Sequence, residues 1–326
     1  MPAPADKRTK WLGQGLAVVL GVAIALLLVE VWNRPLVQDT WKGLWYEPDA
    51  KVAATRADLA LTAAGERIFA ATQPTLEDKD AFNEHCESQN REVSLLGCYV
   101  NGRIYVYEVL REGLTDSNKV TLAHELLHAA WDRMGKSEKA RVSELLEDVR
   151  AANAEWFKTE LASYNEEAKI EEVWTRAGTK LKDLPEELEQ AYAKYFQERA
   201  RIVAFYESYQ APFQELQKRN EKLQTEILAT KAEIVTERAN YAAAVAELDA
   251  EIERFNQCAD AAGCFEAREF EQEREKLMEE KARLEQRREE INEKIERNNR
   301  KVIEYQENQL ALGELVEAMN SQIDNI

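Results

Sequence analysis

Three residues of this 326-residue chain have the types and the spacing of a metal-dependent active site. They are His124, Glu125 and His128, and they lie in the stretch from Thr121 to Arg133. Residues four apart on a helix lie one turn apart on the same face, so the two imidazoles can bind one zinc ion. In a His-Glu-x-x-His motif the glutamate is the general base that takes a proton from a water molecule at the metal. The motif therefore predicts zinc-dependent hydrolysis.

The neighbouring residues are those of a buried helix. The other positions within the motif and directly beside it are leucine and alanine, and no proline or glycine interrupts the stretch. A core helix with two incidental histidines is the alternative interpretation. Burying two imidazoles and a carboxylate without partners is costly, however. Because the whole chain has only three histidines and two of them fall at this spacing, we favour the metal site.

The motif resembles that of the zincin metallopeptidases. The metzincin pattern would need a glycine at position 131 and a histidine at position 134, whereas the chain has Trp131 and Met134. The remaining histidine, His85, precedes the motif. A third imidazole ligand is therefore not expected, and the resemblance is to the gluzincins, in which the third ligand is a carboxylate.

Several carboxylates after the motif could be this third ligand. The stretch from Asn165 to Thr179 resembles the glutamate-bearing segment of uncharacterised membrane-anchored bacterial zincins with a C-terminal coiled coil. That resemblance implies Glu172 as the ligand, with its neighbour Glu171 and the more remote Asp183 as alternatives. Most carboxylates of this stretch are expected to be ordinary solvated side chains.

Two tyrosines further along could take part in catalysis. They are Tyr192 and Tyr195, in a helix predicted to begin at Pro185. Either hydroxyl could donate a hydrogen bond to the oxyanion that forms on the scissile carbonyl, and we name Tyr192 as the candidate. Aromatic residues at helical spacing are more often part of a core, which is the alternative.

The N-terminal segment predicts a membrane anchor. Residues 12–29 carry no charge and would span about 27 Å as a helix, close to the thickness of a bilayer core. The basic residues before them predict a cytoplasmic N-terminus over residues 1–10, a transmembrane helix over 11–32 and a catalytic domain outside the cytoplasm, in a bacterial envelope. A cleaved signal peptide is the alternative, but no small-x-small cleavage site follows.

The cysteines form two local pairs, Cys86 with Cys98 and Cys258 with Cys264. Even numbers of cysteines outside the cytoplasm are typical of disulfides, so we predict two. Zinc binding by the four cysteines is the alternative, but Cys-x-x-Cys spacing is lacking.

One stretch before the motif predicts strands. Residues 95–107 form two β-rich runs around Asn101 and Gly102, the turn residues of a tight hairpin. In the zincins an edge strand before the metal helix pairs with the substrate backbone, and on that resemblance Ile104 to Tyr107 would do so by strand addition. A hairpin that only packs on the helix is the alternative.

The rest of the chain predicts a mainly α protein with a small β-hairpin or sheet. We expect a linker over residues 33–48 and a zincin-like domain over 49–211, with helices at 50–72 and 137–172. Over 212–326 apolar residues recur every seven or four positions among charged ones, a coiled-coil pattern. Its interruption near residue 260 predicts an antiparallel coiled-coil hairpin.

Composition and motif together narrow the range of functions that this chain can have. A net charge of −18 argues against nucleic acid as a partner, because phosphate binding needs clustered basic residues. We predict a membrane-anchored zinc peptidase that cuts peptide or protein substrates. The alternative is a structural or adaptor protein of the cell envelope, whose coiled coil binds a partner and whose zinc domain is inactive or gated.

Overall fold

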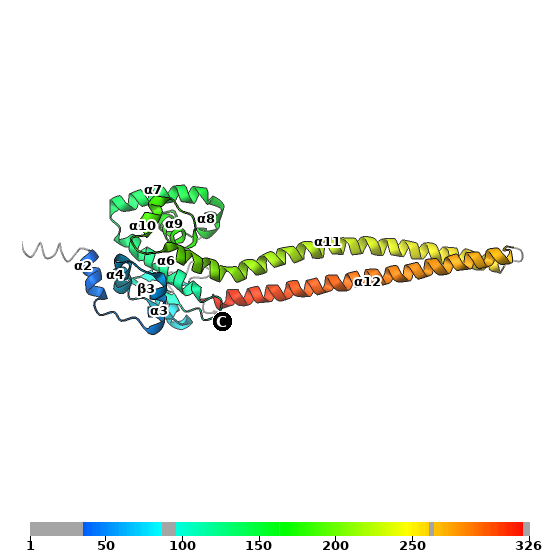
Figure 1. Cartoon of the computed structure of the whole chain (residues 1–326), viewed down its shortest axis with the longest axis horizontal. Coiled ribbons are helices and arrows are strands. Elements are labelled where there is room, and N and C mark those ends of the chain that lie inside the picture. Colours follow the sequence, from blue (N-terminus) through cyan, green and yellow to red (C-terminus); the bar gives the residue numbers. More distant parts are fainter. Residues whose placement is uncertain (1–34, 87–95, 163, 261–263, 322–326) are drawn as a thin grey trace, which may run out of the picture. The chain divides into compact units, whose positions relative to one another are not determined.

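The computed structural model describes residues 35–86, 96–162, 164–260 and 264–321. It confirms a mainly helical protein with one small sheet (Figure 1). The chain divides into two compact units. We call them the main unit, within residues 1–211 and 317–326, and the hairpin unit, residues 212–316.

The main unit begins with three short helices, α2 (Pro35–Gly43), α3 (Ala50–Leu59) and α4 (Ala63–Thr72). The segment predicted as a linker, residues 33–48, thus contains α2, which packs on α4. The single helix predicted over 50–72 is wrong. Ala60 adopts a left-handed conformation with φ of 47°, and Thr62 then caps α4 by accepting a hydrogen bond from the Gly65 amide.

The sheet contains β1 (Thr75–Glu77), β2 (Gly97–Val100) and β3 (Arg103–Tyr107), in the order β1-β3-β2. β2 and β3 form the predicted hairpin, in which Asn101 and Gly102 have φ of 52° and 76°, as a two-residue turn of this type requires. β1 pairs in parallel with the other side of β3. The prediction that Ile104 to Tyr107 bind substrate by strand addition is therefore wrong, because β3 is the central strand and both its edges are paired.

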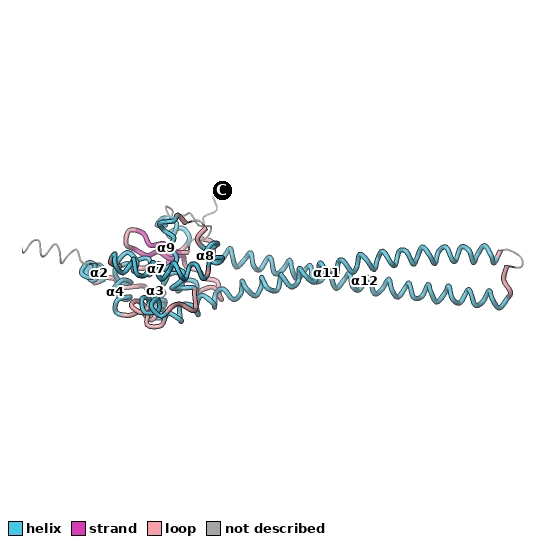
Figure 2. Tube along the Cα trace, turned by 90° about the horizontal axis from the view of Figure 1, so that it is seen from above, coloured by secondary structure: helices cyan, strands magenta, loops and turns pink. Residues whose placement is uncertain are grey.

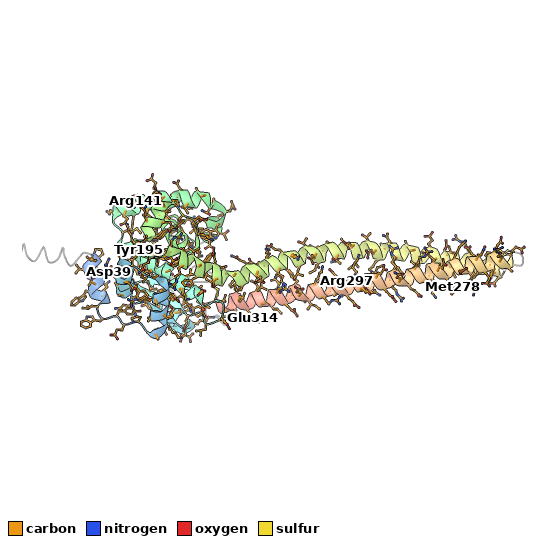
Figure 3. All side chains as sticks on the ribbon, in the orientation of Figure 1. Asp39, Arg141, Tyr195, Met278, Arg297 and Glu314 are labelled. Carbon is orange, nitrogen blue, oxygen red and sulfur yellow. A yellow bond between two sulfur atoms is a disulfide. The ribbon has the colours of Figure 1, made fainter. Side chains whose placement is uncertain are left out.

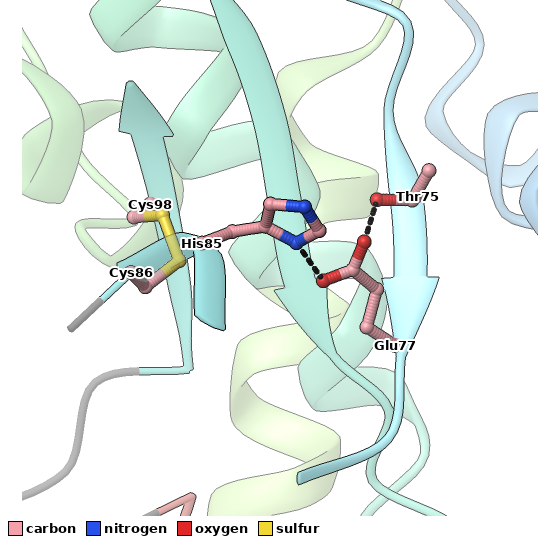
Figure 4. The surroundings of a disulfide bond; sticks show 5 residues. All are labelled: Thr75, Glu77, His85, Cys86 and Cys98. Atoms are coloured by element: carbon pink, nitrogen blue, oxygen red, sulfur yellow. Dashed lines mark hydrogen bonds and ion pairs between the residues drawn. A yellow bond between two sulfur atoms is a disulfide. The ribbon is translucent and has the colours of Figure 1, made fainter. Parts of the chain in front are cut away.

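A disulfide ties the sheet to α5 (Lys79–Cys86). Cys86, the last residue of α5, is bonded to Cys98 in β2, as predicted (Figure 4). Beside it, His85 stacks on Tyr105 and its Nδ1 lies 2.9 Å from a carboxylate oxygen of Glu77. The bond thus fixes α5 against the strand that precedes the turn.

Five helices complete most of the main unit: α6 (Asp116–Arg133), α7 (Lys136–Ala152), α8 (Ala154–Glu160), α9 (Glu166–Lys180) and α10 (Glu186–Tyr192). The continuous helix predicted over 137–172 is interrupted between α7 and α8 and again before α9. α6 carries the His-Glu-x-x-His motif and lies between the sheet with α3 and α4 on one side and α9 on the other (Figure 1). This central position explains why the residues around the motif are apolar.

The hairpin unit consists of two long helices that lie side by side (Figure 2). They are α11 (Arg199–Ala259), which begins in the main unit, and α12 (Ala267–Ala318). Ion pairs join residues that rise in number along α11 to residues that fall along α12, so the helices are antiparallel; these pairs are Arg219–Glu304, Glu226–Lys301 and Glu237–Lys294.

The turn between the two helices is closed by the predicted disulfide between Cys258 and Cys264. Buried leucine and isoleucine side chains occupy the seam, among them Ile234 and Ile291. Other side chains point to solvent, such as Met278, which is 63% exposed (Figure 3).

The predicted localisation requires correction. None of the helices within the described ranges is long and apolar enough to cross a membrane, and the long helices α11 and α12 carry charged residues throughout. This contradicts the predicted single-pass membrane protein, which we do not retain; the predicted transmembrane helix, residues 11–32, lies outside the described residues. The two disulfides are typical of proteins outside the cytoplasm, where thiols can stay oxidised.

Candidate metal centre

Helix α6 directs both histidines of the motif to one place. His124 and His128 are partly buried, with side chains 17% and 15% exposed, whereas Glu125 is buried on the adjoining face. The leucines and alanines around them are buried in the core. The i, i+4 spacing therefore acts as the sequence predicted, and the imidazole Nε2 atoms of the two histidines are 3.3 Å apart.

Helix α9 brings a carboxylate to the same place. The indole of Trp174 donates a hydrogen bond of 3.1 Å to the carbonyl of Leu127, which holds α9 against α6. Gly178 permits this close approach, because a Cβ atom there would lie 2.6 Å from the Leu127 side chain. Glu172 consequently faces the two imidazoles and is 5% exposed.

The three side chains converge on one point. One carboxylate oxygen of Glu172, Oε1, is 3.2 Å from Nε2 of His128, and the other, Oε2, is 3.7 Å from Nε2 of His124. Their ligand atoms all lie within 4.8 Å of one another. Within the described part of the chain, this is the one group of three such side chains close enough to hold a metal ion.

The geometry fits a zinc ion. Ligand atoms about 2.0–2.1 Å from a tetrahedral zinc are about 3.3–3.4 Å from each other. The two Nε2 atoms, 3.3 Å apart, and Oε1 of Glu172, 3.2 Å from Nε2 of His128, are close to this value, whereas the 3.7 Å distance to His124 is made by the other oxygen, Oε2. Oε2 of Glu172 is buried and makes no hydrogen bond, although it forms an ion pair with Nε of Arg176 at 3.3 Å. Two imidazoles with one carboxylate form a donor set of catalytic zinc sites, which leave a fourth position open.

Glu171 supports His128 from behind. Its Oε1 atom lies 2.7 Å from Nδ1 of His128, on the side of the ring away from the convergent atoms. Such a carboxylate fixes the ring and leaves Nε2 to face the metal. Of the sequence alternatives for the third ligand, Glu172 therefore has the required placement, Glu171 contacts the far side of a histidine, and Asp183 is exposed in the loop after α9.

The carboxylates of α9 favour positive charge between the imidazoles. Burial lowers the pKa of His124 well below its usual range. Burial would also lower the pKa of His128, but hydrogen bonds with Glu171 and Glu172 raise it well above its usual range. Burial would raise the pKa of Glu172, but the hydrogen bond and charge of His128 outweigh it and lower this pKa to about 2. Glu172 is therefore ionised at neutral pH and can serve as a metal ligand.

The proposed general base lies beneath the start of β2. A Cβ atom at Gly97 would be 2.9 Å from Cγ and Oε1 of Glu125 and 2.5 Å from a methyl carbon of Thr121. The backbone of β2 therefore passes directly over Glu125. Sequence analysis did not single out Gly97, although a glycine at the start of a strand can mark a close backbone approach.

Tyr192, the predicted oxyanion donor, is part of the core. Its ring is fully buried and stacks on Trp174 with centroids 4.1 Å apart, and its hydroxyl donates a hydrogen bond of 2.7 Å to the Trp174 carbonyl. Burial also raises its pKa well above the usual range. Tyr195 is buried in the same core. The placement corrects the prediction, because neither a substrate nor an oxyanion can reach a hydroxyl that is enclosed and already bonded.

Arg176 is a neighbour of the site that sequence analysis missed. Its Nε atom lies 3.3 Å from Oε2 of Glu172, one helical turn away. The i, i+4 spacing of a glutamate and an arginine is visible in the sequence and could have indicated this contact. What the sequence could not show is that the pair is buried, since that depends on the packing of α8 and α9.

Comparisons with protein-family models, with curated proteins and with solved structures found no match for this chain. The interpretation of the site therefore depends on its own geometry and chemistry.

Proposed function

We propose that this protein is a zinc-dependent peptidase of the gluzincin type. His124, His128 and Glu172 would hold the metal, and Glu125 would act as general base. The observation that carries the proposal is the convergence of His124, His128 and Glu172, whose ligand atoms all lie within 4.8 Å of one another. The carboxylate of Glu171 on Nδ1 of His128 supports the proposal, because metal-binding histidines almost always donate their other ring N–H to a carboxylate, a carbonyl or water.

The residues have separate chemical tasks. A bound zinc ion would supply a Lewis acid that activates water and polarises the carbonyl of a peptide bond. Glu125 would take a proton from the attacking water and deliver it to the leaving amine. Its burial beside Gly97 limits its side chain to a narrow range of positions. Glu171 would keep the His128 ring in place through the reaction.

A second function is favoured by the hairpin unit. We propose that α11 and α12 form an antiparallel coiled coil that binds a protein partner, because apolar side chains remain exposed along both helices. The exposed set is Leu228, Val235, Met278, Ile303, Leu310 and Val316. In the adaptor alternative this binding is the main function, and the metal domain is inactive or gated.

The first experiment measures zinc content and peptide hydrolysis on the full chain. Wild-type protein should contain one zinc ion and cleave an unstructured protein such as casein, and a zinc chelator should abolish cleavage. Glu172→Ala should lose the metal. Asp183→Ala is the matched control, because this alternative carboxylate is exposed outside the site, and it should retain both zinc and activity.

The Glu125→Gln variant distinguishes zinc binding from the hydrolytic step. It should keep the zinc ion and reduce hydrolysis by about 10²–10⁴-fold, the usual contribution of a general base. Undiminished hydrolysis in this variant would refute the mechanism. Wild-type protein that binds no zinc would refute the metal site, and zinc without hydrolysis on any substrate would favour the adaptor alternative.

A further inference from the structure

The carboxylate of Glu172 has cationic as well as imidazole neighbours. Its Oε1 lies 3.2 Å from Nε2 of His128, and its Oε2 lies 3.7 Å from Nε2 of His124. Nε of Arg176, one turn further along α9, lies 3.3 Å from the same Oε2. This arginine is itself buried, with 8% of its surface exposed, so its position depends on the protein groups around it.

Those groups come from α8 and the segment after it. Nη1 of Arg176 donates a hydrogen bond to Glu160, the last residue of α8, and Nη2 donates one of 3.2 Å to the hydroxyl of Tyr164. Glu160 also accepts a hydrogen bond of 2.8 Å from Lys180. The two cations lower the pKa of Glu160, although its burial opposes this, so it is ionised at neutral pH.

The result is a chain of contacts from α8 to the metal centre. Glu160 touches none of the three convergent ligands in the described structure, but it fixes the guanidinium that fixes Glu172. It also offsets the positive charge of Arg176, which would otherwise compete with a metal cation for the carboxylate. Loss of the Glu160 charge would therefore weaken zinc binding through both effects.

We infer that Arg176, anchored by Glu160, is a positioning residue for Glu172 and that Glu160 thereby sets the zinc affinity of the site. The inference rests on the proposed function, since it takes Glu172 as a zinc ligand. Outer-shell partners of metal ligands typically change affinity by about 10–100-fold when they are mutated. Glu160 belongs to this class although it lies two contacts away from the metal.

The test is the zinc dissociation constant of the full chain, measured by competition with a chromophoric chelator. Glu160→Gln should weaken zinc binding by about tenfold or more. Tyr164→Phe removes one further hydrogen bond to Arg176 and should weaken binding less. The absorption bands of the cobalt-substituted protein should shift in Glu160→Gln, because the geometry of the ligands changes.

A matched control is available at the other end of α9. Glu189 holds a second buried arginine, Arg199, which donates hydrogen bonds to backbone carbonyls near the end of this helix, including that of Leu181. Glu189→Gln therefore makes the same substitution in a similar ion pair remote from Glu172. It should leave the zinc affinity and the cobalt spectrum unchanged.

A thermodynamic cycle tests whether Glu160 acts through Arg176. In an Arg176→Met background, Glu160→Gln should change zinc affinity by less than about threefold, because the intermediary is gone. An undiminished effect in that background would overturn the inference. So would wild-type affinity in both Glu160→Gln and Tyr164→Phe, and the proposed zinc site would then still stand. Wild-type protein without zinc would overturn both.

Discussion

A glycine at position 97 restricts the geometry of the candidate site as strictly as the residues with reactive groups do. Gly97 lies where β2 crosses α6, and any Cβ atom there would meet Thr121 and Glu125 at less than 3 Å. The position of Glu125, the proposed general base, is therefore limited by the backbone of β2. Backbone contact of this kind cannot relax by a change of rotamer.

We expect Gly97→Ala to impair catalysis more than metal binding. The added methyl group must displace Glu125 or lift β2, and misplacement by about 1 Å can cost on the order of 100-fold in rate. Zinc content should remain at the wild-type level. The measurement is kcat for peptide hydrolysis together with metal analysis.

The control for this variant is Gly135→Ala. A Cβ atom at Gly135 meets nothing within 4 Å, and its φ of −67° suits any residue. It should change kcat little. Equal losses in the two variants would show that the Gly97 effect is not steric.

Tyr192→Phe distinguishes a core role from a catalytic one. Removal of the hydroxyl deletes the hydrogen bond to the Trp174 carbonyl and should lower the free energy of unfolding by about 1 kcal/mol. The rate of hydrolysis should stay within about twofold of wild type. A loss of about 10²–10³-fold in kcat at unchanged stability would instead restore the oxyanion role.

At this scale the sequence was informative where function depends on local spacing. His124 and His128 could be paired because a helix fixes residues four apart. The choice between Glu171 and Glu172 could not be made from spacing, since adjacent residues on a helix point in directions about 100° apart and only the docking of α9 on α6 decides which one faces both histidines. Tyr192 was misassigned for the same reason, because its burial depends on contacts with α9.

Among the elements, α5 and β2 are linked covalently beside the candidate site. The disulfide between Cys86 and Cys98 joins the end of α5 to the residue that follows Gly97. Both cysteines are buried, and they pack with Phe82 and Tyr105. The strand that covers Glu125 is therefore held both by hydrogen bonds to β3 and by a covalent bond.

Removal of this bond should destabilise the main unit. A loop of this length contributes about 3 kcal/mol in the chain-entropy model, so Cys86→Ser with Cys98→Ser should lower the midpoint of denaturation correspondingly. Cys258→Ser with Cys264→Ser is the control, because that bond closes the turn of the hairpin unit. It should leave unfolding of the main unit and its zinc content unchanged, and equal effects of the two pairs would contradict this assignment.

The elements that sequence analysis found are those with local signals. The β2–β3 hairpin has Asn101 and Gly102 at its turn, and the long helices have a regular apolar repeat. β1 was missed because a three-residue strand has no pattern of its own, and its parallel pairing with β3 depends on distant contacts. The break at Ala60 was missed because alanine rarely adopts a left-handed conformation.

On the scale of the whole molecule, the main unit is built from two separate parts of the chain. Residues 317–321 return to it after the hairpin unit. There the side-chain amide of Asn83, in α5, donates a hydrogen bond to the Ser321 carbonyl, and both residues are buried. The hairpin unit is thus an insertion within the main unit rather than an addition to its end.

Two deletions should consequently behave differently. Replacement of residues 213–316 by a short glycine-serine linker keeps the Ser321 contact and should preserve stability and zinc content. Truncation after residue 212 leaves the buried Asn83 amide without this acceptor and should cost about 1–3 kcal/mol in unfolding free energy. Thermal denaturation of both proteins is the measurement. Higher peptidase activity in the linker variant than in wild type would show that the hairpin unit gates the site.

The insertion also has a consequence for the order of events on the ribosome. The hairpin unit, about 100 residues long, is translated between the two parts of the main unit. At about 5–20 residues per second its translation alone takes roughly 5–20 seconds, during which α5 lacks its last partner. The disulfide between Cys86 and Cys98 can form in this interval, and we expect it to stabilise the nascent sheet until residues 317–321 join the main unit.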